Sequence, residues 1–252
     1  MSIEYYAYLG TELDNLESRF ISCFHDYGFD ILLHPEMSLL ANNQRGCLAI
    51  AVSSTPSYLN RASKDTPLFT SFGYTIAPFN EKNKKITRKL KKCTYIAYTR
   101  TSSGRSRCDA YMQQLTSAIL AKVTQGLFYS MDGDIVMTGD EAIEQVISEL
   151  RNLENKAKEA IAELKELEEE PDAAPWRIQF TQERTDPAFD SDAIPFDGWP
   201  PLESYSSYSF SKPIRSYPAV FNPNPNAKRK KPIKPIKEKI IELLNLFRQD
   251  QI

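Results

Sequence analysis

The sequence has few of the residues on which most catalytic and metal sites depend. Its 252 residues include two histidines, His25 and His34, and four cysteines that form no CxxC pair: Cys23, Cys47, Cys93 and Cys108. Structural zinc sites use closely spaced pairs of such ligands, and a catalytic thiol needs a histidine beside it. We therefore expect no metal, no cofactor and no catalytic residues, and an enzyme is the less favoured class of protein.

Long apolar runs are also missing. The N-terminus lacks the basic segment followed by an apolar segment that marks a secretory signal peptide. No apolar run approaches the roughly 18 residues that a membrane span requires. In a chain of this kind the scattered cysteines are expected to be reduced thiols packed in the interior. We therefore expect a non-secreted protein of a reducing compartment, the cytoplasm, without a membrane partner.

Charge is unevenly distributed, although the net charge is only −2. Residues 82–107 are rich in lysine and arginine and include no acidic residue. Residues 163–203 are mainly acidic, and residues 226–252 are mainly basic. Such segregation favours either docking of opposite segments within the chain or attraction of a charged partner.

The first part of the chain, residues 1–137, has the pattern of an α+β domain. Strands are expected at 3–9, 29–33, 47–53, 69–76, 93–101, 127–131 and 135–137, and helices at 11–27 and from about 109 to 125. Asp132-Gly133 between the last two apolar runs is a hairpin signal. Strands interleaved with two helices favour helices packed on one face of a mostly antiparallel sheet.

A long helix is expected at residues 138–170. Thr138 and Glu141 fit a capping box, and no Gly or Pro follows Gly139 before Pro171. Its apolar residues recur at alternating steps of three and four: Ile143, Val146, Leu150, Leu153, Ala157, Ala160, Leu164 and Leu167. So narrow a stripe suits one helical partner, which could be the C-terminal helix, another protein or a second copy in an oligomer. We favour the intramolecular or partner-protein contact.

Residues 171–235 are expected to form an extended arm, followed by a short amphipathic helix at 236–252. Recurrent prolines exclude a long helix or a central strand from the arm. Its aromatic residues argue against simple disorder, so we expect the arm to lie on a surface of this protein or of a partner. Aromatic side chains supply much of the binding energy at interfaces, which makes several of them candidate binding residues: Trp176, Trp199, Tyr205, Tyr208 and Tyr217.

The loop at 102–107 is the best candidate for binding a small anion. Arg105 and Arg107 lie just before a predicted helix, whose first backbone amides attract anions. The loop matches neither of the glycine-rich phosphate-binding motifs. An ordinary loop with a serine cap is the simpler interpretation.

Residues 94–146 resemble bacterial immunity proteins of polymorphic and type VI secretion toxins. The resemblance rests on a strand and Ser/Gly/Arg loop, a helix with a glutamine, a turn ending in glycine, a hairpin and a final helix. The matching positions are Gly104, Arg105, Gln113, Gly126 and Gly133. The resemblance implies a protein that neutralises a toxin by binding it.

These observations lead to three functional hypotheses. The first is a non-enzymatic interaction protein, an immunity protein that binds a cognate bacterial toxin. The second is a nucleic-acid-binding protein that uses the basic segments 82–107 and 228–239. The third is an enzyme acting on a nucleotide-like anionic ligand near Arg105 and Arg107, and no sequence pattern places a carboxylate there.

Overall fold

The computed structural model describes residues 3–42, 46–59, 65–79, 90–101, 106–130, 135–168, 196–202 and 205. All of them belong to one compact unit, Met1–Arg215. The second unit, Ser216–Ile252, includes the helix expected at 236–252 and lies outside the described residues. Most of the arm expected at 171–235 also lies outside them.

The described residues form a seven-stranded sheet in which every neighbouring pair is antiparallel. The strand order is β2-β3-β4-β5-β1-β6-β7, so the N-terminal strand lies inside the sheet, between β5 and β6. The strands are β1 Ile3–Leu9, β2 Asp30–Leu33, β3 Cys47–Ser54, β4 Leu68–Pro78, β5 Tyr95–Thr101, β6 Leu127–Ser130 and β7 Ile135–Met137. The predicted α+β class, with a mostly antiparallel sheet, is confirmed.

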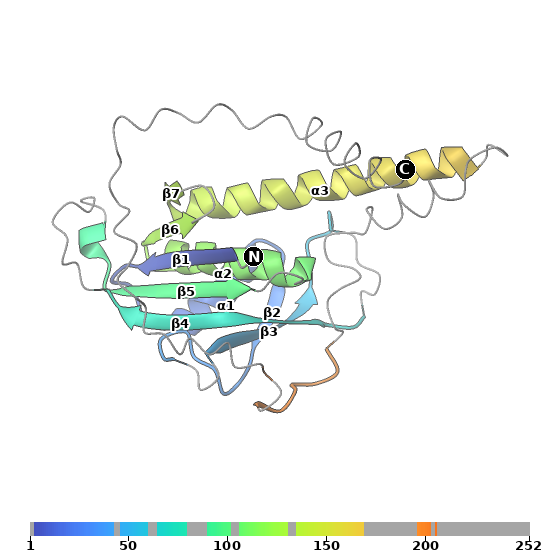
Figure 1. Cartoon of the computed structure of the whole chain (residues 1–252). Coiled ribbons are helices and arrows are strands. Elements are labelled where there is room, and N and C mark those ends of the chain that lie inside the picture. Colours follow the sequence, from blue (N-terminus) through green and yellow to red (C-terminus); the bar gives the residue numbers. More distant parts are fainter. Residues whose placement is uncertain are drawn as a thin grey trace, which may run out of the picture. The chain divides into compact units, whose positions relative to one another are not determined.

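Within the described residues there are three α-helices, α1 Leu16–Asp26, α2 Arg107–Val123 and α3 Gly139–Glu168, and one 3-10 turn, Leu90–Lys92. Helices α1 and α2 lie on the same face of the sheet, and α3 runs along α2 (Figure 1). None of these helices is long and apolar enough to cross a lipid bilayer.

Helix α2 is the centre of the domain. Its residues from Met112 to Ala121 are all buried. It begins with a capping box in which the Ser106 hydroxyl accepts a hydrogen bond from the Asp109 backbone N–H at 3.0 Å. The fully buried Gln113 amide bonds β5 and β1: its oxygen accepts from the Thr101 hydroxyl at 2.8 Å, and its nitrogen donates to the Ile3 carbonyl at 3.2 Å. The amide thereby fixes how the helix lies on the sheet.

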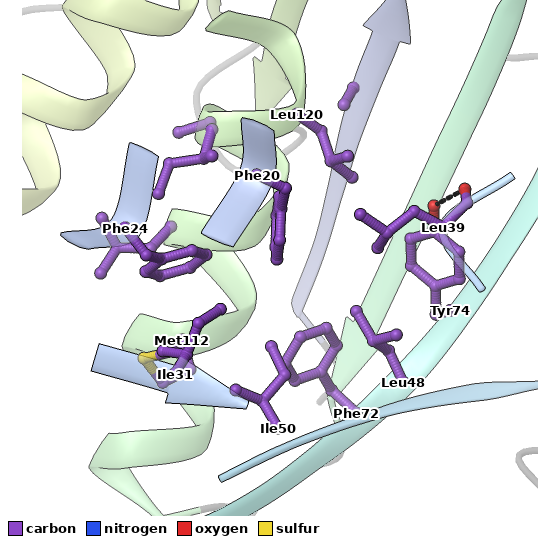
Figure 2. Packing of buried hydrophobic residues seen from close by; sticks show 14 of the residues in the cluster. Phe20, Phe24, Ile31, Leu39, Leu48, Ile50, Phe72, Tyr74, Met112 and Leu120 are labelled. Carbon is purple, nitrogen blue, oxygen red and sulfur yellow. Dashed lines mark hydrogen bonds between the residues drawn. The ribbon is translucent and has the colours of Figure 1, made fainter. Parts of the chain in front are cut away.

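Aromatic and aliphatic side chains fill the space between the helices and the sheet (Figure 2). Phe20 and Phe24 of α1 pack edge to face at 4.9 Å between ring centroids. The buried Tyr74 hydroxyl donates to the Leu39 carbonyl oxygen at 2.6 Å, which satisfies its polar end. The four cysteines are all buried, as predicted.

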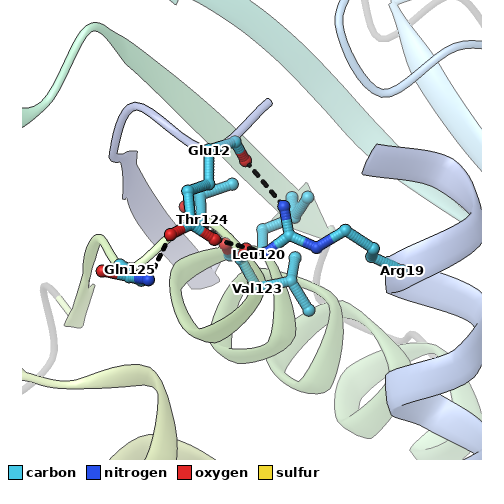
Figure 3. A network of polar contacts seen from close by, with 6 residues as sticks. All are labelled: Glu12, Arg19, Leu120, Val123, Thr124 and Gln125. Atoms are coloured by element: carbon cyan, nitrogen blue, oxygen red, sulfur yellow. Dashed lines mark hydrogen bonds and ion pairs between the residues drawn. The ribbon is translucent and has the colours of Figure 1, made fainter. Parts of the chain in front are cut away.

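Helix α1 begins later than predicted, at Leu16 instead of Thr11. Asn15 adopts a left-handed backbone conformation with φ of 53°, which interrupts any helix before it. Glu12 instead pairs with Arg19 at 3.0 Å and accepts a hydrogen bond from Gln125. Arg19 also donates to the Val123 carbonyl oxygen, so this network joins the start of α1 to the end of α2 (Figure 3).

The partner of the first half of the long helix is α2, which the periodicity alone did not identify. Ile143, Val146 and Leu150 are fully buried, and Leu153 is partly buried. The start of α3 is held by the predicted capping box of Thr138 and Glu141 and by an ion pair of Lys122 with Asp140 at 2.8 Å. A side chain at Gly139 would collide with the Lys122 backbone. The side chains of Ala157, Ala160, Leu164 and Leu167 lie outside the described residues.

Two leucines one turn apart on α3 test this packing. Replacing the fully buried Leu150 with Ala should lower the free energy of unfolding by about 2–5 kcal/mol, because it leaves a cavity against the core. The same change at Leu153, which is partly exposed, should cost only about 1 kcal/mol. Urea unfolding of both variants measures the difference. Equal losses would contradict the arrangement of α3 on α2.

Candidate binding surfaces

Three tyrosines meet on the face of the sheet that α1 and α2 leave uncovered. Side chains along β1 alternate: Tyr5, Ala7 and Leu9 belong to the core, so Tyr6 points to the opposite face. Tyr6 is paired with Tyr98 of β5 on one side and with Tyr129 of β6 on the other. The ring centroids are 5.0 Å and 5.7 Å apart. We call this cluster, with Glu4 and Arg100, the tyrosine face.

The polar groups of the tyrosine face are arranged around Glu4. Its carboxylate lies 3.6 Å from the Arg100 guanidinium. Burial raises the pKa of the Tyr6 and Tyr98 hydroxyls, and the neighbouring Glu4 raises both further. Both tyrosines therefore remain neutral at physiological pH. Tyr6 and Tyr98 are partly exposed, whereas Tyr129 is buried and contacts the Tyr6 ring.

The tyrosine face was not predicted from the sequence. Its signal was present in the alternation of residues along β1 and β5, which assigns Tyr6 and Tyr98 to the same face once the two strands are paired. The pairing itself was not predictable, because β1 and β5 are far apart in the chain and β5 also pairs with β4.

The β3–β4 half of the same face is covered by a segment of the predicted arm. We call residues 196–202 and Tyr205 the aromatic strap. The Phe196 backbone N–H donates to the Pro67 carbonyl oxygen at 2.5 Å. Trp199 meets the His34 ring edge to face at 4.9 Å, and the Tyr205 ring lies 5.8 Å from that of Phe69. The strap thus packs on the chain's own domain.

Two of the predicted aromatic binding residues, Trp199 and Tyr205, are covered by contacts within the domain. Tyr205 is buried, with only 5% of its surface exposed, and burial raises its pKa to about 12. Trp199 is partly buried in the same cluster. Both therefore stabilise the domain. Three other aromatic candidates and one arginine lie outside the described residues: Trp176, Tyr208, Tyr217 and Arg105.

The remaining candidate, Arg107, lines a hollow of about 360 Å³ between α2 and α3. The lining residues are Tyr5, Arg107, Ala110, Tyr111, Gln114, Glu149 and Leu153. Burial raises the pKa of the Tyr111 hydroxyl; Glu149 raises it further, and Arg107 opposes this. The hollow thus combines a cation, an anion and three neutral polar side chains, those of Tyr5, Tyr111 and Gln114. The sequence pointed to Arg107 but gave no sign of Glu149, which lies on another helix.

A histidine–aspartate pair lies at a third place, beside a hollow of about 450 Å³ that Ser18 and Ser22 also line. Nδ1 of His25 is 2.5 Å from the Asp30 carboxylate, whose other oxygen accepts a hydrogen bond from the Ser54 hydroxyl at 2.5 Å. Such a pair can orient an imidazole for proton transfer. In the described part of the chain, however, neither Ser18 nor Ser22 is hydrogen-bonded to His25, and no group of residues could hold a metal ion.

No protein-family model, curated protein or solved structure matches this chain.

The His25–Asp30 pair makes stability depend on pH. The hydrogen bond to Asp30 raises the pKa of His25 above 6.5, and the bonds from Ser54 and His25 lower the pKa of Asp30 below 3.8. The histidine's contribution is complete below pH 6.5 and is lost as pH rises through its raised pKa. The aspartate's contribution is complete above pH 3.8 and is lost as pH falls through its lowered pKa.

The two contributions therefore coincide between about pH 4 and 6.5. The Tm difference between the native protein and His25→Asn should be largest in that range and should shrink at higher pH. In the control variant Asp30→Asn, the pKa of His25, followed by NMR, should fall toward its usual value. An unchanged His25 pKa in that variant would contradict the pairing.

Proposed function

We propose that this chain is a non-enzymatic interaction protein, an immunity protein that binds and neutralises a cognate bacterial toxin in the cytoplasm. The observation that carries the proposal is the tyrosine face: two partly exposed tyrosines, Tyr6 and Tyr98, beside Arg100 on adjacent strands. Tyrosine and arginine are the residue types that dominate the binding energy of protein interfaces.

The position of these tyrosines supports binding without rearrangement. Tyr6 and Tyr98 lie on interior strands of the sheet; their rings contact one another, and the Tyr6 ring also contacts Tyr129. Side chains that are already ordered lose little conformational entropy when a partner covers them. A preorganised aromatic patch of this kind suits a tight complex with another protein.

The resemblance to immunity proteins supports the proposal at the level of the fold. Of its matching positions, Gln113 bonds α2 to the sheet, and a side chain at Gly126 would collide with the Tyr8 carbonyl oxygen. Both residues therefore serve the domain's architecture. Gly104, Arg105 and Gly133 lie outside the described residues. We therefore propose that the tyrosine face, and not Gln113 or Gly126, contacts the toxin.

A nucleic-acid-binding protein is the second candidate, because tyrosines on neighbouring strands of a sheet can also stack on unpaired bases. The charge of the face disfavours it. Arg100 lies close to Glu4, which offsets the positive charge that a phosphate would need. The basic segments 82–107 and 228–239 would have to supply that charge, and residues 82–89, 102–105 and 228–239 lie outside the described residues.

The toxin-binding proposal is tested by purifying the tagged protein from its native host and identifying any partner present in equal amount. We expect a protein encoded by a neighbouring gene, whose toxicity the chain suppresses on co-expression. Tyr98→Ala should weaken the purified complex by at least about thirtyfold, because an aromatic anchor is worth some 2 kcal/mol. Tyr111→Ala, a partly buried tyrosine on the other side of the sheet, is the control and should leave affinity unchanged. Recovery of no stoichiometric partner, or equal effects of the two variants, would refute the proposal.

The second candidate is tested by titrating the protein against a mixed-sequence single-stranded oligonucleotide in a gel-shift assay. Nucleic-acid binding predicts a complex at low salt whose affinity falls steeply as salt rises, through counterion release. It also predicts that Tyr98→Ala weakens that complex by about 1–3 kcal/mol of lost stacking. We expect no complex, which would leave protein binding as the function of the tyrosine face.

A further inference from the structure

The hollow between α2 and α3 is a site separate from the tyrosine face. Three of its polar residues, Arg107, Tyr111 and Gln114, occupy successive turns along one side of α2, and Glu149 faces them from α3. Tyr5, the remaining aromatic residue of the lining, belongs to the core side of β1. The hollow therefore lies on the helix-covered side of the sheet, and Tyr6 and Tyr98 on the other.

Gln114 is the residue that points to a ligand. Only 9% of its surface is exposed, and it lines the hollow. Among the hydrogen bonds of the described residues, none is made by its side-chain amide. The neighbouring Gln113, by contrast, uses its amide fully within the fold. The polar atoms of Gln114 are not among the described buried atoms that lack a hydrogen-bond partner, so the amide reaches the hollow and is available to a molecule inside it.

Tyr111 presents a second unused group. Its hydroxyl makes no hydrogen bond within the described part of the chain, and it lies close enough to Glu149 and Arg107 for both charges to affect its pKa. Tyr111 and Gln114 both line the hollow, one turn apart along α2. A planar polar ring placed against the Tyr111 ring would therefore be within range of a hydrogen bond from the Gln114 amide.

The charges of the hollow indicate the rest of the ligand. Arg107 begins α2, and its guanidinium suits a phosphate. The N-terminal end of α2 is already occupied by a negative charge, because the Asp109 carboxylate accepts a hydrogen bond from the Ser106 backbone N–H. The Arg107 guanidinium, and not the backbone amides of the helix, would therefore hold the anion. Glu149 is an acceptor for hydroxyl donors and accepts one bond from Gln145 at 2.9 Å.

We propose that this hollow binds a nucleoside monophosphate. Arg107 holds the phosphate, Tyr111 stacks on the base, the Gln114 amide pairs with the base edge, and Glu149 accepts from the sugar hydroxyls. The volume of about 360 Å³ lies in the range of small-molecule sites. The site is a binding site: nothing in the proposal requires a chemical step, and it does not depend on toxin binding at the tyrosine face.

The test is an NMR titration of the isotope-labelled full chain with AMP, GMP, CMP and UMP in turn. At least one nucleotide should shift backbone amide signals in the first two turns of α2 and around Glu149. Inorganic phosphate and the matching nucleoside, each carrying half of the ligand, should bind at least about tenfold more weakly. The absence of shifts in both helices with all four nucleotides at about 1 mM would overturn the proposal, as would equal binding of inorganic phosphate.

Three variants identify the site. Arg107→Gln, Gln114→Leu and Tyr111→Leu, which removes the stacking ring, should each weaken the nucleotide by at least about tenfold. Arg107 is partly exposed in the first turn of α2, so Arg107→Gln decides the outcome if Gln114→Leu or Tyr111→Leu disturbs the fold, as circular dichroism would show. Arg100→Gln removes an arginine from the tyrosine face and is the matched control, with unchanged nucleotide affinity. Native affinity in Arg107→Gln, or an equal loss in Arg100→Gln, would place binding elsewhere and refute the assignment.

Discussion

The structure depends on how one amide is buried. Gln113 lies at the centre of α2 with no exposed surface, and it hydrogen-bonds Thr101, Thr99 and the Ile3 carbonyl. An unpaired buried amide costs about 1–3 kcal/mol, so any slide or rotation of α2 on the sheet is penalised by the loss of these bonds. With α2 fixed, its remaining sides become the surfaces on which α1 and α3 pack. A single polar constraint thus orients three helices that apolar packing alone would hold less specifically.

Much of the fold was predictable because its local signals agree with its tertiary structure. The order of strands and helices followed from apolar periodicity, and the strand prediction 3–9 coincides with β1 Ile3–Leu9. The start of α1 was not predictable, because the Glu12 network that replaces its first turn includes Arg19, Gln125 and the Val123 carbonyl. Such contacts between distant parts of the chain leave no pattern in a local window.

The same distinction explains the sites. Arg107 could be singled out from the sequence, since a helix start rich in arginine is a local feature. Its neighbours in the hollow could not: Glu149 reads as one of many charges on a long solvated helix until α3 is placed against α2. Likewise, Tyr6 and Tyr98 gain significance only through the pairing of β1 with β5. The heptad stripe of α3 was visible, but a stripe specifies the shape of its partner and not which helix provides it.

The aromatic strap has a consequence for how this protein can be shortened. Phe196, Trp199 and Tyr205 follow α3 in the chain, yet they cover His34 and Phe69, which belong to the first third of the sequence. A truncated chain ending at Glu168 would retain every strand and helix of the described domain while uncovering this aromatic cluster to water. Newly exposed apolar surface promotes self-association. The boundary of the folding unit therefore lies beyond its last helix. A shortened chain that stops at the end of regular secondary structure would self-associate, although its strands and helices are intact.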